Sequence, residues 1–227
     1  FCHARLMRDG AVLYLMGHAG NLRIVRSADG GETWGRASDI TTDDNFYVRP
    51  PGSPWAANGS LIVPAVRTMD KGYRMDDARA YSLVLWRARQ GGDLTDRRNW
   101  TVSPPSPTLS EFMGAESPAG SGIPFERAVS YGRSDSGSSP FQPGWDSPQV
   151  LQIADADHIW HDPTGRTFIV LARLQGVRRN VAVMARGVED DSGIIRLEPV
   201  RTAAGARWIF LPLPGGSLGF DVFFDDT

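Results

Sequence analysis

Residues 27–34 read SADGGETW, and this stretch decides how the rest of the sequence is interpreted. The segment before it, 21–26 (NLRIVR), and the Thr-Trp pair that closes it carry strand-forming side chains. Between them, Asp29 can accept hydrogen bonds from amides just downstream, and the two glycines that follow can adopt a positive φ without steric strain. The stretch therefore predicts a tight turn between two antiparallel strands.

The same eight residues carry a longer pattern, Ser-x-Asp-x-Gly-x-Thr-Trp. It is matched at every fixed position, by Ser27, Asp29, Gly31, Thr33 and Trp34. This pattern resembles the Asp-box of sialidases and related β-propellers. The resemblance implies that the Asp ties the turn together and that the Trp packs between neighbouring sheets. It also implies a turn between the third and fourth strands of a propeller blade, away from the active site, so the motif predicts fold rather than chemistry.

Repeats of a four-strand unit extend this interpretation along the chain. Strands are expected at 2–7, 11–16, 22–26 and 33–37 in a first blade; around 55 and at 60–66, 80–88 and 99–103 in a second; at 158–161, 167–174, 180–186 and 194–200 in a third; and at 219–224, opening a fourth. We predict an all-β fold, a sialidase-type β-propeller with about three to four four-stranded blades present and the propeller incomplete. A β-sandwich, which also uses short strands and regular turns, is the alternative.

The chain is predicted to be one partial propeller domain over residues 1–227 with a long insertion at about 104–147. The insertion is rich in Pro, Gly and Ser, and it is either disordered or a loop over a functional face. Within the second blade, Pro64 predicts an edge strand or a bulge, because proline cannot donate to a sheet ladder.

The composition limits the kinds of binding partner and cofactor that are expected. The net charge is −2, which predicts no broad attraction to nucleic acid, and no apolar run is long enough to span a membrane. No phosphate-binding glycine loop or cysteine motif is present, so no cofactor is predicted. A metal site is not predicted either, because His158 and His161, placed on a strand three residues apart, would point to opposite faces. We expect the full-length protein to be secreted or periplasmic, although this sequence shows no signal peptide.

The blade topology sorts the connections onto two faces. Turns after first and third strands lie on one face, where Asp29, Asp162 and Asp191 are expected to act only as turn residues. The starts of first strands and the connections between second and third strands lie on the other, where propellers bind ligands. The catalytic candidates expected there are Asp157, Asp146, Asp70, Tyr73 and His158. The substrate-binding candidates are Arg49, Arg173, Arg179 and His18.

The resemblance implies a sialidase-like glycoside hydrolase that acts on glycans, with anionic sugars as the expected substrates. Sialidases hold the sugar carboxylate with arginines and use a Tyr–Glu pair as nucleophile and an Asp as acid/base. The family's N-terminal (F/Y)-R-I-P motif is absent here, and no residue matches its Tyr, Glu or Asp by motif. The acid and base are therefore sought among Asp70, Asp146, Asp157 and Glu126, and Asp157→Asn or Arg179→Ala is expected to abolish activity.

Two alternatives remain open at this point. A polysaccharide lyase on the same scaffold would use His158 or Tyr73 to abstract the proton next to a uronate carboxylate. A non-catalytic propeller would bind a glycan or a protein without turnover, because a fold does not fix a function.

Overall fold

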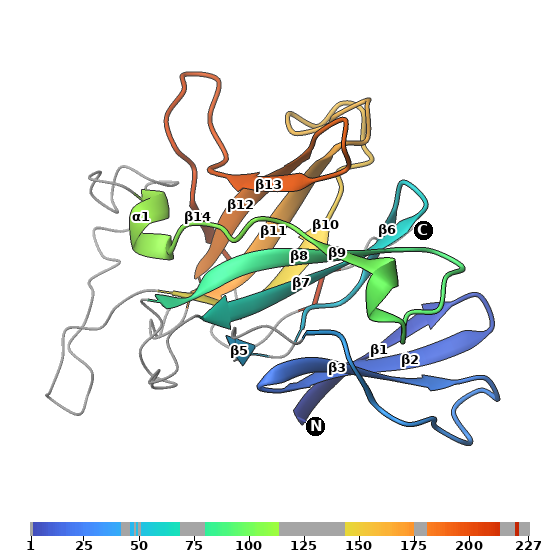
Figure 1. The fold of residues 1–227 in the computed structure, drawn as a ribbon. Helices are drawn as coiled ribbons and strands as arrows, with labels where there is room; N and C mark the ends of the chain where they lie inside the picture. Colours follow the sequence, from blue (N-terminus) through green and yellow to red (C-terminus); the bar gives the residue numbers. More distant parts are fainter. Residues whose placement is uncertain are drawn as a thin grey trace, which may run out of the picture.

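The structure is a computed structural model that describes residues 2–41, 46–47, 49, 51–68, 80–113, 144–174, 181–213 and 221–222. Its strands form three antiparallel sheets (Figure 1). Sheet 1 contains β1 (Cys2–Asp9), β2 (Val12–Ala19), β3 (Asn21–Ser27) and β4 (Ser38–Asp39); sheet 2 contains β5 (Phe46–Tyr47), β6 (Trp55–Ala57), β7 (Ser60–Thr68), β8 (Ser82–Arg89) and β9 (Trp100–Val102); sheet 3 contains β10 (Trp145–Leu151), β11 (Thr167–Leu174), β12 (Val181–Glu189), β13 (Ile195–Glu198) and β14 (Phe210–Pro212). The two short helical segments are η2 (Arg97–Asn99) and α1 (Leu109–Met113).

Each sheet is built on an up-and-down path of strands that follow one another in the sequence. In sheet 2 the first strand is split into β5 and β6, which both pair with β7. In sheet 3 an extra strand, β14, pairs with β12. Such four-stranded meanders are the blades of a β-propeller. The predicted all-β propeller fold is confirmed, with three blades among the described residues. The predicted fourth blade, 219–224, lies outside them except for residues 221–222.

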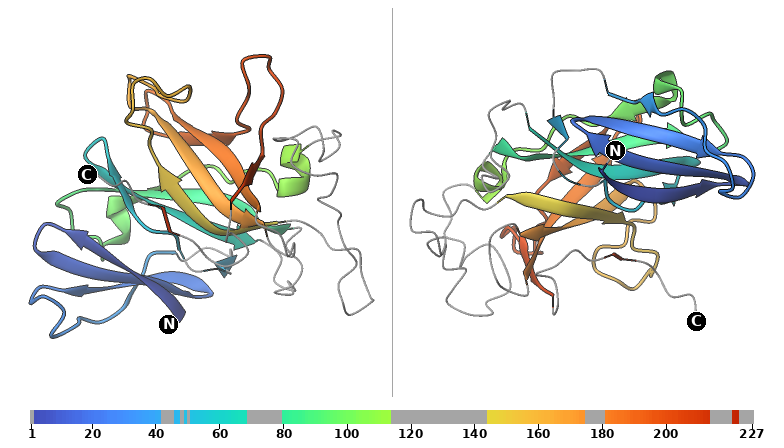
Figure 2. Two further views of the ribbon diagram at one scale, coloured as in Figure 1. Left: turned by 180° about the vertical axis from the view of Figure 1, so that it is seen from behind. Right: turned by 90° about the horizontal axis from the view of Figure 1, so that it is seen from below.

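Sheet 2 lies between the other two sheets (Figure 2) and buries both of its faces. Side chains of one parity along β7, such as Leu61 and Val63, pack with Tyr14 and Met16 of sheet 1. Side chains of the other parity pack with sheet 3; Ile62 is one of them. This alternation explains why β7 is apolar at nearly every position, because a strand buried on both faces has no solvent side.

The turn at 27–34 is tied by its own side chains. The Asp29 carboxylate accepts hydrogen bonds from the amide and the hydroxyl of Thr33, and these bonds lower the pKa of Asp29. Ser27 Oγ accepts from the Gly31 amide at 2.9 Å. The predicted turn is therefore correct, but Trp34 does not pack between sheets: its side chain is 36% exposed and its Nε1 donates to the Gly31 carbonyl.

The fourth strand of sheet 1 is not at 33–37, as the sequence predicted, but at Ser38–Asp39. The turn continues through Gly35, whose amide donates to the Arg26 carbonyl at 2.8 Å, and this delays the return of the chain to the sheet. In sheet 2, Trp100 is 2% exposed and packs against Trp86 in the apolar cluster shared with sheet 1.

The prediction of a strand at 158–161 is wrong. The first strand of sheet 3 is β10, whose start lies inside the predicted insertion 104–147. Residues 155–161 instead form consecutive turns between β10 and β11, with the His158 amide donating to Asp155 and the His161 amide to His158. The blade repeat predicted a strand directly before the turn at 162–165, but short turns of the connection between β10 and β11 occupy that place.

Pro64 lies in an interior strand rather than on an edge, as β7 pairs on both sides. The sheet tolerates it because β5 and β6 leave a gap opposite it. There Gly52 donates its amide to the Pro64 carbonyl at 2.8 Å. Gly52 also closes the contact between sheets 2 and 3: a Cβ atom at this position would lie 1.9 Å from the carbonyl oxygen of Pro148.

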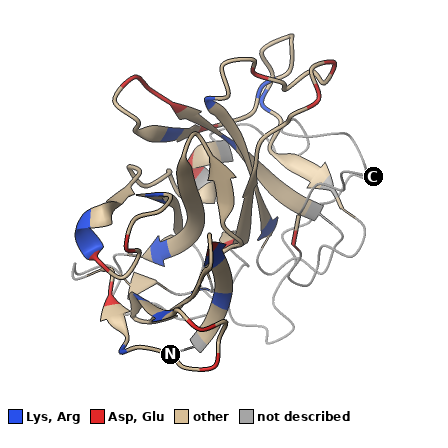
Figure 3. Cartoon of the chain, turned by 90° about the vertical axis from the view of Figure 1, so that its right-hand side faces the viewer, with Lys and Arg blue, Asp and Glu red and all other residues tan. Residues whose placement is uncertain are grey.

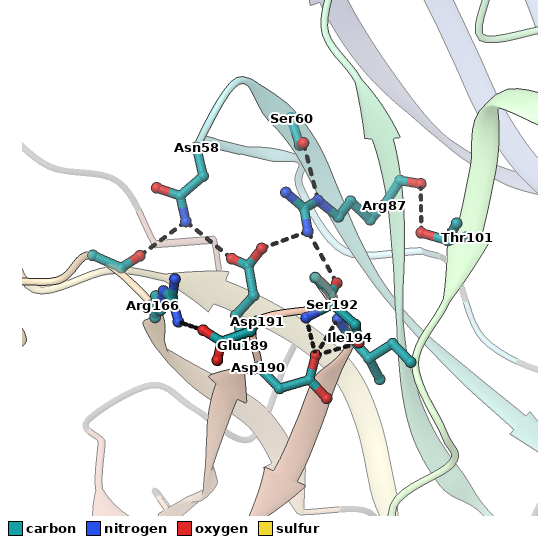
Figure 4. Close-up of polar contacts among 12 residues, drawn as sticks. Asn58, Ser60, Arg87, Thr101, Arg166, Glu189, Asp190, Asp191, Ser192 and Ile194 are labelled. Atoms are coloured by element: carbon teal, nitrogen blue, oxygen red, sulfur yellow. Dashed lines mark hydrogen bonds and ion pairs between the residues drawn. The ribbon is translucent and has the colours of Figure 1, made fainter.

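A polar latch joins sheets 2 and 3 at the end where β7 begins and β8 ends (Figure 4). Arg87 donates to Glu189 at 2.5 Å and to the Gly193 carbonyl at 2.9 Å, and Asn58 donates to Glu189 and to Gly165 at 3.0 Å each. In the turn beside it, the carboxylate that accepts the local amides belongs to Asp190. The neighbouring residue predicted for that role, Asp191, is 95% exposed and pairs with Arg166.

We expect Gly52→Ala to lower the free energy of unfolding by about 2–3 kcal/mol, because the added methyl group cannot fit without moving sheet 3 away from sheet 2. Urea unfolding measures this loss. Gly35→Ala is the matched control, since a Cβ there meets only the Arg26 carbonyl at 3.5 Å, an ordinary contact. Equal stability of the two variants would contradict the tight contact.

The latch is tested by a double-mutant cycle with Arg87→Met and Glu189→Gln. Because these side chains are only 22% and 10% exposed, we expect a coupling energy of about 2 kcal/mol from urea unfolding. The same cycle on Arg166 and Asp191, whose side chains are 49% and 95% exposed, should give less than about 0.5 kcal/mol. Similar couplings for both pairs would show that the latch does not hold the sheets.

Candidate functional site

A group of charged side chains lies at the end of the sheets opposite to the latch. At this end, called the site end below, β1, β5 and β10 begin and β2, β7 and β11 finish. It lies on the left in Figure 1, where β7 ends and β8 begins. The side chains that define it are His3 and His18 of sheet 1, Arg67 of sheet 2, Asp146 and Arg173 of sheet 3, and two residues outside the strands, Arg49 after β5 and Tyr81 before β8.

Asp146 is the centre of the charged group. Its side chain is 1% exposed, and its carboxylate accepts hydrogen bonds from Arg173 through both Nε, at 2.9 Å, and a terminal nitrogen. Arg49 Nε lies 3.2 Å from the other carboxylate oxygen, and the Ser147 hydroxyl also donates to that oxygen. Three donor groups thus surround one buried carboxylate, an arrangement that holds two guanidinium groups in fixed positions.

The first strands of all three sheets are irregular at this end. The register of β1 shifts between Cys2 and Arg5, with His3 at φ 51°, and that of β10 shifts between Asp146 and Gln149, with Ser147 at φ 45°. In sheet 2 the first strand is interrupted outright between β5 and β6. Residues other than glycine rarely adopt such positive φ values. In proteins, these conformations and strand irregularities cluster near functional sites, where they orient side chains.

His18 projects from the end of β2 toward sheet 2, with the same parity as Tyr14 and Met16. Burial lowers its pKa, and the nearby charges of His3 and Arg49 lower it further. A hydrogen bond to the Tyr47 backbone acts in the opposite direction, as expected when the imidazole donates to a carbonyl. Nε2 is buried and has no hydrogen-bond partner in the part of the chain that the structure describes. The lowered pKa favours the neutral imidazole, whose Nε2 has no partner among the described residues.

Arg67 is a site residue that the sequence analysis missed. It lies at the end of β7, in register with Tyr47 on one side and Ser82 on the other. Its side chain is half-buried, and its Nε is buried without a hydrogen-bond partner within the described ranges. The signal was present but weak: Arg67 follows a strongly apolar strand just before the connection expected at the binding face.

The structure brings together four of the predicted residues at the site end: Asp146, Arg49, Arg173 and His18. It separates Asp157 and His158 from them, so the prediction that these two residues belong to the site is wrong. They lie in the turns between β10 and β11, at the latch end, because the strand assumed to carry them does not exist. Asp70, Tyr73 and Arg179, with Glu126, lie outside the described residues.

Charges of both signs are interspersed over the three sheets (Figure 3). Among the described residues, no group of three or more His, Cys, Asp or Glu side chains is placed to hold a metal ion. No helix in that part of the chain is long and apolar enough to cross a membrane. Among the described residues, the site end therefore supplies arginine and histidine side chains and one buried carboxylate.

No family model and no curated protein matches the sequence. Solved structures with a similar fold include the α-L-arabinofuranosidase from Lactobacillus brevis (14% identity, TM-score 0.46, 87% of this chain and 56% of that one) and an exo-1,5-α-L-arabinanase from a bovine ruminal metagenomic library (10%, 0.43, 90% and 57%). Trypanosoma rangeli sialidase in complex with the inhibitor DANA is a further one (12%, 0.33, 86% and 37%). The chain spans less than two thirds of each of these proteins. The strand topology of this chain defines its fold class, which is an all-β chain of propeller blades. Its site end is rich in arginine.

Asp146→Asn is expected to lower the free energy of unfolding by about 3 kcal/mol, because it leaves two partly buried arginines without their counter-charge. Asp39→Asn is the control: it breaks the exposed Arg23–Asp39 pair and should change stability by less than about 1 kcal/mol. Urea unfolding of both variants measures the difference. An Asp146→Asn protein as stable as the wild type would argue against the anchoring of Arg49 and Arg173 by this carboxylate.

The lowered pKa of His18 predicts how the stability of the protein depends on pH. Since its pKa is lower in the folded protein than the ordinary value of 6.5, the unfolded chain binds the extra proton more readily. Stability contributed by neutral His18 is therefore complete above that value and declines as the pH falls through it. We expect a shallower decline of the melting temperature between about pH 7 and pH 5 in His18→Gln than in the wild type. Parallel profiles would contradict the assignment.

Proposed function

We propose that this chain forms part of a sialidase-like glycoside hydrolase that acts on glycans carrying a carboxylate. The single observation that carries the proposal is the Asp146-centred group, in which one buried carboxylate holds Arg49 and Arg173 at the site end. Together with Arg67, three guanidinium groups accompany this carboxylate among the described residues of the site end. The excess positive charge favours an anionic ligand, and a planar guanidinium suits a carboxylate in particular.

Within this proposal, Asp146 positions the arginines rather than transferring a proton, because its oxygens already accept hydrogen bonds from Arg173 and Ser147 and form an ion pair with Arg49. Arg173 remains 28% exposed, so a ligand can approach it from solvent. Glycoside hydrolysis needs further groups to protonate the leaving oxygen and to attack the sugar. Asp70, Tyr73 and Glu126 remain the sequence candidates for these steps.

A lyase is the second candidate, and His18 favours it. Elimination from a uronate needs cationic groups that neutralise the carboxylate and a neutral base that removes the adjacent proton. Arg49 lies close enough to His18 to lower its pKa, and His18 Nε2 has no hydrogen-bond partner among the residues that the structure describes. In this alternative His18 replaces His158, which lies at the latch end, as the expected base. A binding propeller without turnover is the third.

The experiment incubates the purified protein with acidic and neutral oligosaccharides and follows two products. Hydrolysis releases a sugar without new ultraviolet absorbance, whereas elimination creates a C=C bond that absorbs. We expect release from the acidic set only, with Arg173→Gln lowering kcat/KM at least about tenfold through loss of a charge-assisted contact. Arg166→Gln, at the latch end, is the matched control and should keep wild-type turnover.

Three outcomes decide between the candidates. New absorbance that is lost in His18→Gln would replace hydrolysis by elimination. Binding of acidic oligosaccharides without any product would identify a binding propeller. Equal turnover of acidic and neutral sets, or an unchanged Arg173→Gln enzyme, would overturn the assignment of the site.

A further inference from the structure

The dipeptide Asn58–Gly59 combines a reactive sequence with a structural role in the latch. The chain contains five asparagines, and Asn58 is the one that glycine follows. The others, followed by Leu, Phe, Trp or Val, are Asn21, Asn45, Asn99 and Asn180. Asn58 and Gly59 form the two-residue turn between β6 and β7, with φ values of 50° and 68°. This is the turn that an Asn-Gly pair favours, because both of its residues need a positive φ.

An Asn-Gly sequence can convert to aspartate without an enzyme. The backbone nitrogen of the glycine attacks the side-chain carbonyl carbon of the asparagine, Cγ, since glycine has no Cβ to shield that nitrogen. The N–Cγ bond forms, the Cγ–Nδ2 bond breaks, and the leaving nitrogen takes the amide proton and departs as ammonia. Water then opens the cyclic imide at either carbonyl and gives aspartate or isoaspartate. The net reaction consumes one water and releases one ammonia.

In the folded protein, the amide that would react is the one that holds the latch. Asn58 Nδ2 donates to Glu189 Oε2 and to the Gly165 carbonyl, at 3.0 Å each (Figure 4). The reaction needs Cγ to move onto the Gly59 nitrogen, and this rotation withdraws Nδ2 from both acceptors. The two hydrogen bonds therefore oppose the reaction as long as the latch is closed.

The product would replace a hydrogen-bond donor by an acceptor at this position. Both atoms that Asn58 Nδ2 contacts are oxygens, and an ionised carboxylate has no proton to donate to them. The Glu189 side chain is only 10% exposed, so a second carboxylate beside it adds like-charge repulsion. The cations of this region already have partners, since Arg87 binds Glu189 and Arg166 binds Asp191. An aspartate at position 58 therefore loses the contacts that the amide makes.

We propose that Asn58 is a deamidation site and that its conversion to aspartate or isoaspartate opens the latch between sheets 2 and 3. Water is the only other reactant. Because the closed latch restrains the reacting amide, the rate of conversion depends on how often the latch opens. The modification is one-way, since the ammonia is lost, so sheets 2 and 3 stay less tightly joined at this end. The inference concerns the end opposite the candidate site, and it does not require that the chain cleave a glycan.

Peptide mass spectrometry of the purified chain, stored at mildly alkaline pH, tests the modification. We expect aspartate and isoaspartate to accumulate at Asn58 while Asn99, also exposed but followed by Trp, stays unchanged. Glu189→Ala removes one of the restraining bonds and should accelerate conversion about fivefold, the effect expected for the loss of one hydrogen bond. Asp191→Ala is the matched control, because this neighbouring carboxylate is 95% exposed and makes neither bond, and it should leave the rate unchanged.

Asn58→Asp tests the effect of the product on the latch. Urea unfolding should show an unfolding equilibrium constant about tenfold larger than that of the wild type, against about threefold for Asn58→Gly. The glycine variant loses the same two hydrogen bonds and tolerates the positive φ, but it adds no charge. The excess loss in Asn58→Asp should disappear in a Glu189→Gln background, because the repulsion needs both carboxylates.

Three results would overturn the proposal. The first is conversion of Asn99 as fast as that of Asn58. The second is the same rate at Asn58 in the native chain and in the chain unfolded in urea, a comparison that also serves if Glu189→Ala does not fold. The third is an Asn58→Asp protein as stable as Asn58→Gly, because the product would then leave the latch closed. None of these measurements uses a glycan, so the proposed function and this inference fail independently.

Discussion

Burial of sheet 2 on both faces is the constraint from which the rest of the structure follows. A strand such as β7 that has no solvent side must be apolar at successive positions, and its neighbours must supply apolar faces of matching parity. Sheets 1 and 3 do so with Met16 and Val170, among others. Because the faces are filled, the ion pairs Arg87–Glu189 and Arg49–Asp146, which link sheets 2 and 3, lie toward the ends of the strands. The molecule therefore has two polar ends and an apolar middle.

The two ends use charge differently. At the latch end, carboxylates accept hydrogen bonds from amides and hydroxyls two to four residues downstream, as Asp29, Asp162 and Asp190 do. These bonds are local, and they close turns. At the site end, Asp146 accepts hydrogen bonds from Arg173 of its own sheet and forms an ion pair with Arg49, which follows β5 of sheet 2. A carboxylate whose partners are distant in the sequence fixes the relative position of sheets, and it also fixes the guanidinium groups that a ligand would meet.

This difference explains how much could be predicted from sequence. Local features were readable: the Asp29 turn, the strands around Leu61 and Val170, and the propeller class all follow from short patterns. The site was half readable. Blade topology put Asp146, Arg49 and Arg173 on one face, but it also placed Asp157 and His158 there, since one misassigned strand moves every residue on it to the other end. Arg67 was missed because a sequence does not show that its Nε is buried without a hydrogen-bond partner among the described residues.

Irregularity of the first strands connects the fold to the chemistry. Regular strands would continue their ladders to the end and point alternate side chains into the apolar layers. The shifts at His3 and Ser147 and the gap between β5 and β6 interrupt the ladders at the same level in all three sheets. The gap also lets Gly52 approach Pro148 and removes the need for a donor at Pro64. The same interruption that accommodates a proline in an interior strand thus frees backbone and side chains to build a site, so the packing of sheet 2 and the geometry of the site end cannot be altered separately.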